Sequence, residues 1–311
     1  NSDYIYSVAE TSDGGYIVGG KSYSNSIDLG NGVTLNNNGD YDGIIIKYDS
    51  EGNAEWAKEI EADDANSVTE TRDGGYIVGG VRGGYGYTDG MIIKYDTIGN
   101  EEWIKIIDET REVRIESVVE TNDGGYIAVG YFEGESIELE NGQILNNDSS
   151  WSSGMIIKYN NNGETQWGIS ISAYVSVEIM SVVETQDGGF IVGGNYSSSQ
   201  RVVNLGNDVI LDRNNRKAGM IIKYDGEGNA QWAHEIGGDS KNTQGDGIKS
   251  VRLANDGGVI LGGYFSSNNV ILKDDIVLKN SNSNNCEGMI IKYDVNGHAQ
   301  WAKVIGGSGY D

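Results

Sequence analysis

The chain is built from five copies of one sequence pattern. Each copy reads close to Ser-Val-x-Glu-Thr-x-Asp-Gly-Gly-Tyr-Ile-Val-Gly-Gly, runs through a stretch of variable length, and ends Gly-Met-Ile-Ile-Lys-Tyr-Asp-x-x-Gly-Asn-x-x-Trp. A repeat of this size constrains the architecture before any local pattern is considered. The Asp-Gly-Gly element recurs 50 to 69 residues apart, at Asp13, Asp73, Asp123, Asp187 and Asp256. A residue shared by all copies is therefore first suspected of a structural role, and one that breaks the pattern is the better site candidate.

One copy reads as four short β-strands. In the third copy these are 116–121, 126–130, 154–159 and a last strand that carries Trp167 and ends near Ile171. Turn sequences rich in Asn, Asp and Gly separate strands one and two, and strands three and four. The apolar run 155–157 predicts a strand buried on both faces of its sheet. No copy shows a long 3.6-residue periodicity, so an all-β, five-bladed β-propeller of four-stranded antiparallel blades is predicted. Its blades, in one domain over 1–311, would be 1–60, 61–107, 108–172, 173–236 and 237–311.

The pattern ending in Gly-Asn-x-x-Trp, followed by Ile-Gly-Gly in the last two copies, resembles the bacterial SBBP-type β-propeller repeat. The stretch 26–35, Ser-Ile-Asp-Leu-Gly-Asn-Gly-Val-Thr-Leu, resembles the characteristic insertion of that family. The resemblance covers essentially the whole chain. It implies a propeller in a bacterial, often exported or surface-attached protein, and no common reaction or ligand. The family is associated with seven blades, so the five copies here are either a five-bladed ring, which we favour, or part of a larger one.

Composition excludes several classes of function. The formal net charge of -25 argues against nucleic-acid binding and against docking on an anionic membrane. It is compatible with divalent cations, basic partners or neutral sugars. Cys286 is the single cysteine, which excludes an internal disulfide and a multi-cysteine zinc site. The sequence has no apolar run of membrane-spanning length and no secretory signal at its start. Because it starts at Asn1 without Met, we expect a mature or excised piece.

Catalytic chemistry finds little support in the sequence. His234 and His298 stand where other copies have Lys or Asn, and we expect both at exposed outer positions without a nucleophile nearby. The turns beginning at Asp49 and Asp225 offer oxygen ligands, but they lack the spacing of an EF-type calcium loop and are interpreted as hairpin turns. Four equivalent acids lie on the innermost strand, and we expect them to bond the backbone or the repeated lysines: Glu10, Glu70, Glu120 and Glu184.

Five of the six tryptophans recur at one position and are predicted to pack between blades: Trp56, Trp103, Trp167, Trp232 and Trp301. The connections between strands two and three diverge in sequence and are the expected binding face: 21–42, 81–89, 131–153, 195–218 and 264–287. Four of them contain a predicted extra hairpin: 27–35, 137–145, 203–211 and 270–278. The second connection lacks such a hairpin, which would leave a notch in the binding face over the second blade. Alternatively, the five connections simply vary in length.

The candidate binding residues lie on this variable-loop face: Trp151, Tyr85, Tyr87, Tyr41, Arg82 and Asp89. Trp151 is the unrepeated tryptophan, in a Ser- and Asn-rich stretch where it either contacts a ligand or folds onto its own hairpin. The sequence thus favours a non-enzymatic binding or display module, without cofactor, metal or catalytic residues. We expect a monomeric domain of a larger bacterial surface or secreted protein, without membrane insertion, that recognises a glycan or a protein. The alternatives are a carboxylate-dependent glycosidase or lyase, and a structural spacer.

Overall fold

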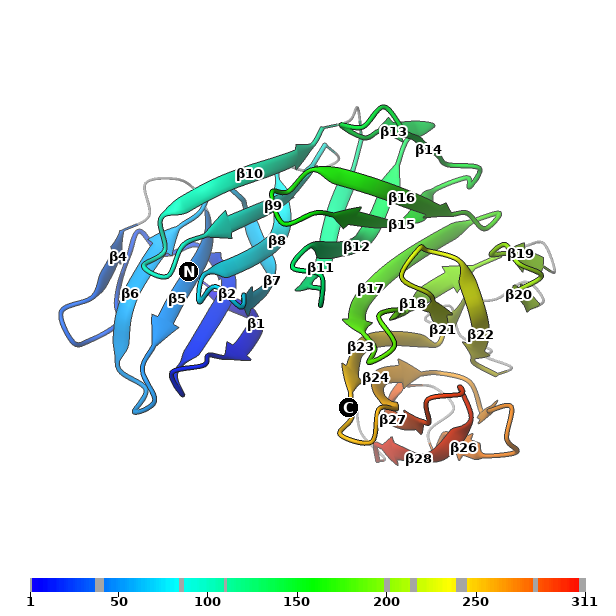
Figure 1. Ribbon diagram of the computed structural model, residues 1–311. Coiled ribbons are helices and arrows are strands. Elements are labelled where there is room, and N and C mark those ends of the chain that lie inside the picture. The colour runs from blue at the N-terminus through cyan, green and yellow to red at the C-terminus, as the bar shows by residue number, and fades with distance from the viewer. Residues whose placement is uncertain are drawn as a thin grey trace. The chain divides into compact units, whose positions relative to one another are not determined.

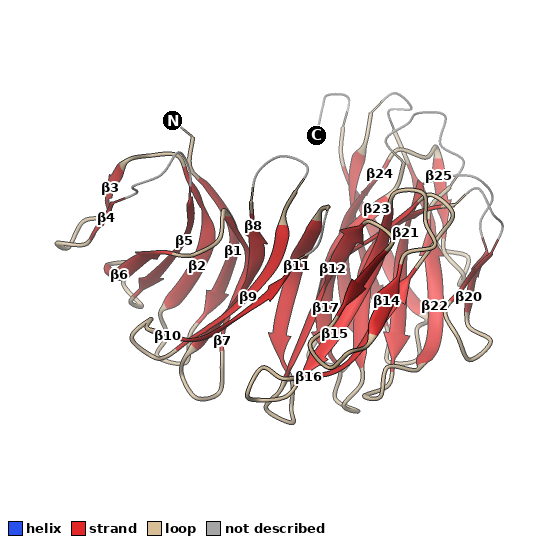
Figure 2. Cartoon of the chain, turned by 90° about the horizontal axis from the view of Figure 1, so that it is seen from above, coloured by secondary structure: helices blue, strands red, loops and turns tan. Residues whose placement is uncertain are grey.

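The computed structural model describes residues 2–36, 42–83, 87–108, 111–198, 202–212, 217–238, 245–281 and 285–307. These residues form 28 β-strands (Figure 1). Strands and connecting loops, without a helix, account for all of the described chain in Figure 2. Within that part of the chain there is consequently no helix long and apolar enough to cross a membrane. The all-β class predicted from the sequence is confirmed.

The long strands form antiparallel arrays in the order expected of the repeat. The first sheet, in spatial order, is β1 (Tyr4–Glu10), β2 (Tyr16–Ser22), β5 (Asp42–Tyr48) and β6 (Ala54–Glu59). The second sheet is β7 (Asp64–Glu70), β8 (Tyr76–Arg82), β9 (Asp89–Tyr95) and β10 (Glu101–Ile107). The last sheet is β23 (Gly247–Leu253), β24 (Val259–Phe265), β27 (Glu287–Tyr293) and β28 (Ala299–Ile305).

The third and fourth copies share one eight-stranded sheet. The third copy supplies β11 (Val113–Glu120), β12 (Tyr126–Glu133), β15 (Ser152–Tyr159) and β16 (Thr165–Ile171). The fourth copy supplies β17 (Ser176–Glu184), β18 (Phe190–Ser197), β21 (Lys217–Tyr224) and β22 (Ala230–Ile236). The two sets of strands join where Ser152 pairs in parallel with Ser176. This junction is a difference from the separate four-stranded sheets predicted for these two copies.

All four predicted hairpins in the variable connections are confirmed as two-stranded sheets. They are β3 (Ser26–Asp28) with β4 (Thr34–Asn36), β13 (Ser136–Glu138) with β14 (Ile144–Asn146), β19 (Val202–Asn204) with β20 (Ile210–Asp212), and β25 (Asn269–Ile271) with β26 (Val277–Lys279). In the second copy, β8 ends at Arg82 and β9 begins at Asp89, so its connection is short.

The chain divides into two compact units. Unit 1 comprises residues 1–144 and 157–168, and unit 2 comprises 145–156 and 169–311. The boundary therefore passes through β15 and β16. That the whole chain is a single propeller domain, with its blades closed into a ring, stays a prediction.

The Asp-Gly-Gly turn shows why its residues repeat. Asp13 Oδ1 accepts hydrogen bonds from the Thr11 hydroxyl at 2.6 Å and the Gly15 N–H at 2.9 Å, which closes the hairpin. Gly14 has a φ of 81°, a left-handed conformation that favours glycine. A Cβ on Gly15 would lie 2.2 Å from the carbonyl oxygen of Tyr48. Both glycines are therefore required by the backbone and not by a ligand.

Each core lies between consecutive sheets. As predicted, the third strand of a copy is buried on both faces; in β15 all eight residues are buried. In unit 1, Ile17 and Ile45 of the first sheet pack in one apolar cluster with Val68, Tyr76 and Val78 of the second. In unit 2, Ile191 and Ile221 pack in the same way with residues of the last sheet.

Candidate functional site

Unit 2 carries a polar cleft of about 420 Å³ on its variable loops. Its walls come from β14 and the loop after it, from the end of β16 and the segment that follows it, and from the hairpin strand β19. The lining residues are Asn146, Asp148, Ser170, Ser172, Ala173, Tyr174, Val202, Val203 and Asn204. The volume falls within the range of small-molecule sites, and the hydroxyl, amide and carboxylate groups can hydrogen-bond a polar ligand.

The loop that leads from β14 to β15 is held against the segment after β16. Asn147 Oδ1 accepts from the Ser149 N–H at 2.8 Å and from the Ser153 hydroxyl at 2.6 Å. The Ser153 hydroxyl also lies 2.7 Å from that of Ser172, which in turn accepts from the Asp148 N–H at 3.2 Å. One wall of the cleft is thus fixed by a network of short polar side chains.

Two exposed aromatic side chains flank this wall. Trp151 is 66% exposed and Tyr174 is 51% exposed. Their segments are joined by hydrogen bonds from the Trp151 N–H to the Val175 carbonyl at 3.0 Å and from the Ser150 hydroxyl to the Tyr174 carbonyl at 2.9 Å. An exposed aromatic ring beside hydrogen-bonding groups is an arrangement that suits a ligand with one apolar face and a polar edge. Because Trp151 is 66% exposed, it does not fold back into a buried position on its own hairpin.

Tyr174 and the serines of the cleft were not predicted. The repeat pattern identifies variable loops, but it does not tell which loop of the next copy approaches a given one. The sequence does hold one signal for Tyr174. It is an aromatic residue without an equivalent in the other copies, in a segment of small residues.

The residues predicted around the short second connection are brought together only in part. The Arg82 guanidinium forms an ion pair with Asp89 at 2.8 Å, so these two side chains neutralise one another. Tyr87 is 71% exposed. Tyr41 and Tyr85 lie outside the described residues. These residues belong to unit 1, whereas Trp151 belongs to unit 2.

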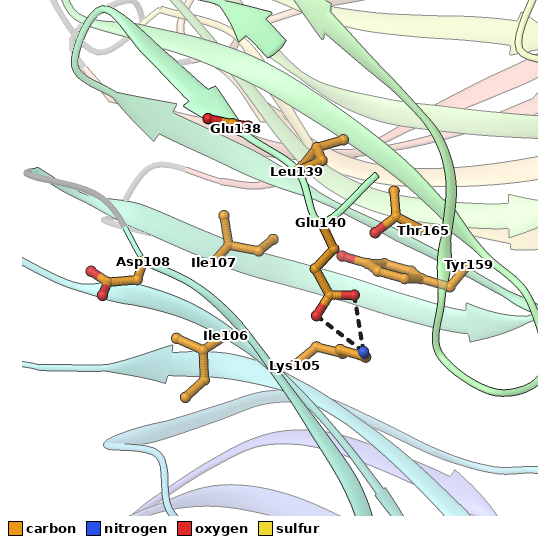
Figure 3. A pocket seen from close by; sticks show the side chains of 9 residues that line it. All are labelled: Lys105, Ile106, Ile107, Asp108, Glu138, Leu139, Glu140, Tyr159 and Thr165. Atoms are coloured by element: carbon orange, nitrogen blue, oxygen red, sulfur yellow. Dashed lines mark hydrogen bonds and ion pairs between the residues drawn. The ribbon is translucent and has the colours of Figure 1, made fainter. Parts of the chain in front are cut away.

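Unit 1 has a smaller cleft of about 180 Å³ beside β10 and β13 (Figure 3). Lys105 Nζ bonds both carboxylate oxygens of Glu140, at 3.0 and 2.9 Å. In Figure 3 the side chains of Asp108 and Glu138 point away from this pair. The acid nearest the centre of the cleft is thus already neutralised, and no second carboxylate faces it among the side chains drawn.

The repeated charged residues have structural partners. Glu70 accepts from the Ser12 N–H at 2.7 Å, and Glu120 accepts from the Arg72 N–H at 2.8 Å, so each binds the turn of the preceding copy. The expected backbone bonds are confirmed for these two acids. The repeated lysines, however, pair with the aspartates of Asp-Gly-Gly: Lys47 with Asp13, Lys94 with Asp73, Lys158 with Asp123, Lys223 with Asp187 and Lys292 with Asp256.

The prediction of an exposed His234 is wrong. Its ring stacks between Trp232, with centroids 5.1 Å apart, and Tyr293, at 5.8 Å. Burial lowers the pKa of this imidazole. The prediction failed because other copies carry Lys at this position, and a single sequence does not show that two aromatic rings lie on either side of it. His298 is exposed, as expected, and its Nδ1 lies 3.3 Å from Asp274 Oδ1.

The turns that begin at Asp49 and Asp225 are hairpin turns, as predicted. Asp49 Oδ1 accepts from the N–H groups of Glu51 at 2.9 Å and Asn53 at 2.8 Å. Asp225 bonds Glu227 and Asn229 in the same way. Both carboxylates therefore accept hydrogen bonds from N–H groups of their own turns. Over the described ranges, no group of three or more His, Cys, Asp or Glu side chains is arranged to hold a metal ion.

Comparison with known proteins gives likeness of structure alone. No protein-family model matches the chain, and no curated protein sequence matches it. A solved structure of the Dos1 propeller is similar over 97% of this chain and 70% of its own, with 11% identity and a TM-score of 0.49. Sqt1 from Chaetomium thermophilum is similar over 95% of this chain and 83% of its own, with 14% identity and a TM-score of 0.40.

YCF48, solved with a D1 peptide, is similar over 97% of this chain and 80% of its own, with 8% identity and a TM-score of 0.41. At these identities and TM-scores, the likenesses carry no argument about the ligand or activity of this chain. The SBBP-type resemblance remains an expectation from the sequence.

Proposed function

We propose that this chain is a non-enzymatic binding module that recognises a glycan through the variable loops of unit 2. The observation that carries the proposal is the 420 Å³ cleft with Tyr174 in its wall and Trp151 on the adjoining segment. Aromatic rings can stack on the apolar face of a sugar while hydroxyl and amide groups bond its oxygens. The ligand would be uncharged or cationic, because the chain has a net charge of -25.

The proposal extends to the setting of the protein. We place the chain in a bacterial surface or secreted protein, with its four-stranded repeats acting as the five blades of a β-propeller. The SBBP-type resemblance supports the setting, and antiparallel sheets packed through apolar clusters support the blades. Such a scaffold holds variable loops in fixed positions.

An enzymatic function has weaker support. Glycoside hydrolysis uses two carboxylates at a defined separation in one cleft. Of the described residues that line the 420 Å³ cleft, Asp148 alone is acidic. The repeated acids Glu70 and Glu120 already accept hydrogen bonds from backbone N–H groups. A glycosidase would therefore lack its second group in this cleft.

A glycan-array screen of the purified chain, followed by calorimetric titration of the best binder, tests the proposal. Trp151→Ala and Tyr174→Ala should each weaken binding about tenfold to a hundredfold, as expected for a loss of roughly 1–3 kcal/mol at an aromatic contact. Tyr87→Ala is the matched control, because it removes an exposed aromatic ring from unit 1. Binding to no glycan would reject the proposal in favour of a protein partner or a spacer.

A further inference from the structure

The polar cleft of unit 2 contains one carboxylate that the protein itself does not use. Asp148 lines the cleft, and its backbone N–H donates to the Ser172 hydroxyl at 3.2 Å. Within the part of the chain that the structure describes, its carboxylate accepts no hydrogen bond and forms no ion pair. None of the described residues that line the cleft is a lysine, an arginine or a histidine. Other acids of the chain, such as Glu140 and Asp123, are paired with lysines, whereas the charge of Asp148 is available to a ligand.

Asp148 also breaks the pattern of the repeat. It is the third residue after Leu145, the last leucine of the extra hairpin in the third copy. In the other copies that have such a hairpin, an uncharged residue stands at this position: Asn38, Asn214 and Ser281. Those copies form their two-stranded hairpins as well, so the hairpin does not require a carboxylate here. An acid found only in the copy that lines the cleft is better explained by a ligand than by the fold.

The segment of Asp148 is joined to the segment of Tyr174. The Ala173 N–H donates to the Ser149 hydroxyl at 3.1 Å, and the Ser150 N–H donates to the Tyr174 carbonyl at 3.1 Å. These bonds keep the carboxylate and the aromatic residue on adjoining parts of one cleft wall. A carboxylate combined with an aromatic ring is an arrangement that suits a cation, which forms charge-assisted hydrogen bonds with the first and a cation–π contact with the second.

The other groups in the cleft are uncharged and match the hydroxyl groups of a sugar. Asn204 Oδ1 accepts from the Gly206 N–H at 2.9 Å, which leaves the amide NH2 group of Asn204 to donate to a ligand. The Ser170 hydroxyl and the Asn146 amide can both donate and accept. Val202, which is 45% exposed, adds apolar surface. The cleft therefore offers one charge among several neutral polar groups, as a polyhydroxylated ligand with a single cationic group requires.

We propose, on the basis of the function proposed above, that the glycan carries a free amine, as in a de-N-acetylated hexosamine, and that Asp148 binds its ammonium group. A carboxylate only accepts hydrogen bonds, and an ammonium group offers three donors and the opposite charge. An acetamide group at the same place on the sugar offers one N–H and no charge. The net charge of -25 also attracts a cationic glycan during association.

A glycan array with matched pairs tests the proposal. Each hexosamine-containing glycan is printed twice, once N-acetylated and once with its free amine, and is screened at a pH of about 6, where an aliphatic amine is protonated. We expect the free-amine member of the best pair to bind about tenfold more tightly in calorimetric titration, the effect of one added charge-assisted contact. Added salt should reduce this preference, because it screens the attraction between the ammonium group and the carboxylate.

Asp148→Asn removes the charge and keeps the shape of the side chain and the backbone bond to Ser172. It places at this position the residue type that the first and fourth copies already have, so the fold should be unchanged. The variant should bind the N-acetylated and the free-amine forms alike. Glu227→Gln is the matched control, because it removes the same charge from the exposed turn between β21 and β22 of unit 2. This control should keep the preference for the free amine.

The outcomes separate the nature of the ligand from the function itself. A best binder without an amine overturns the assignment of the ammonium group but leaves glycan binding in place, as does a preference for the amine that survives in Asp148→Asn. Binding to no glycan rejects both. A lysine-containing peptide that binds the wild-type chain as tightly as the best free-amine glycan would show that charge alone is recognised, which also overturns the assignment.

Discussion

The indole of Trp56 meets the ring of Tyr76 edge-on, with centroids 5.5 Å apart and an interplanar angle of 67°. Trp56 lies on the fourth strand of one copy and Tyr76 on the second strand of the next. The two most recognisable aromatic residues of the repeat therefore contact one another between sheets. This contact indicates that the repeated aromatic residues stabilise the packing of neighbouring sheets. The unrepeated Trp151 and Tyr174 are therefore the better candidates for ligand contact.

Replacing a tryptophan between sheets should cost more than replacing its exposed equivalent. Trp232→Ala should lower the free energy of unfolding by about 2–4 kcal/mol, somewhat below the usual cost for a fully buried aromatic ring. Trp301→Ala should lower it by less than about 1 kcal/mol, because this ring is 41% exposed. Urea unfolding of the two variants measures both values, and they lie in the same unit. Equal losses of unfolding free energy in the two variants would contradict the role of Trp232 in packing between sheets.

The glycine of the second turn should be more sensitive to substitution where a tryptophan covers it. Gly52 and Gly99 have φ values of 84° and 77°, so alanine is strained at either position. Gly52→Ala should cost about 1–2 kcal/mol for the left-handed backbone alone. Gly99→Ala should cost roughly 1–3 kcal/mol more, because the methyl group would press on Trp56. Thermal unfolding of both variants provides the comparison, and an identical loss would argue against a tight contact.

The sequence predicted those features that depend on contacts within one copy. The four extra hairpins were predictable because apolar residues alternate about turn residues, as in 137–145. Contacts between copies were not. The cleft, for example, requires Asn146 and Asp148 of the third copy to lie beside Tyr174 of the fourth. The pairing of Lys94 with Asp73 lies within one copy and was still missed, because it requires the third strand to lie beside the first turn. His234 was misplaced because a single sequence gives no measure of what surrounds a substituted position.

Acid should destabilise the chain through the aspartates of the Asp-Gly-Gly turns. Burial alone would raise the pKa of Asp123, but hydrogen bonds from Thr121, Lys158 and Gly125 outweigh it and lower the pKa to about 2. The pKa of Asp187 is lowered to about 2 by the same balance with its own partners. The unfolded chain takes up these protons near pH 4 and the folded chain near pH 2, so stability is lost between those values. Unfolding temperatures measured across this window should fall, and Asp187→Asn should reduce the slope.

A second loss of stability should appear at milder pH. Burial lowers the pKa of His234 below the usual 6.5, and the opposing contact with the Gly297 backbone does not offset it. The unfolded chain therefore binds a proton that the folded chain resists, and stability should decline as the pH falls below about 6.5. His234→Phe keeps a ring between Trp232 and Tyr293 and should abolish this decline between pH 8 and pH 5. Calorimetric scans with an unchanged slope in the variant would show that other groups cause it.

The buried lysines predict how much each turn aspartate matters. The Lys158 side chain is 6% exposed and pairs with Asp123 at 2.9 Å. Asp123→Ala leaves this charge without its carboxylate; because the Asp123 side chain is itself 59% exposed, the cost should be about 1.5–3 kcal/mol, the range for a hydrogen bond to a charged group. Lys94 is equally buried, but it contacts both Asp73 at 2.9 Å and Glu102 at 3.1 Å. Asp73→Ala should therefore cost less, because Glu102 still compensates the charge.

The decisive comparison removes this compensation. In the third copy, Gln166 stands where the second copy has Glu102. Asp73→Ala combined with Glu102→Gln should therefore be about as destabilising as Asp123→Ala alone, whereas Glu102→Gln by itself should change little. Denaturant unfolding of the four variants gives the coupling energy between Asp73 and Glu102 directly. If the two losses simply add, Glu102 does not share the charge of Lys94, and the turns are held by their backbone hydrogen bonds instead.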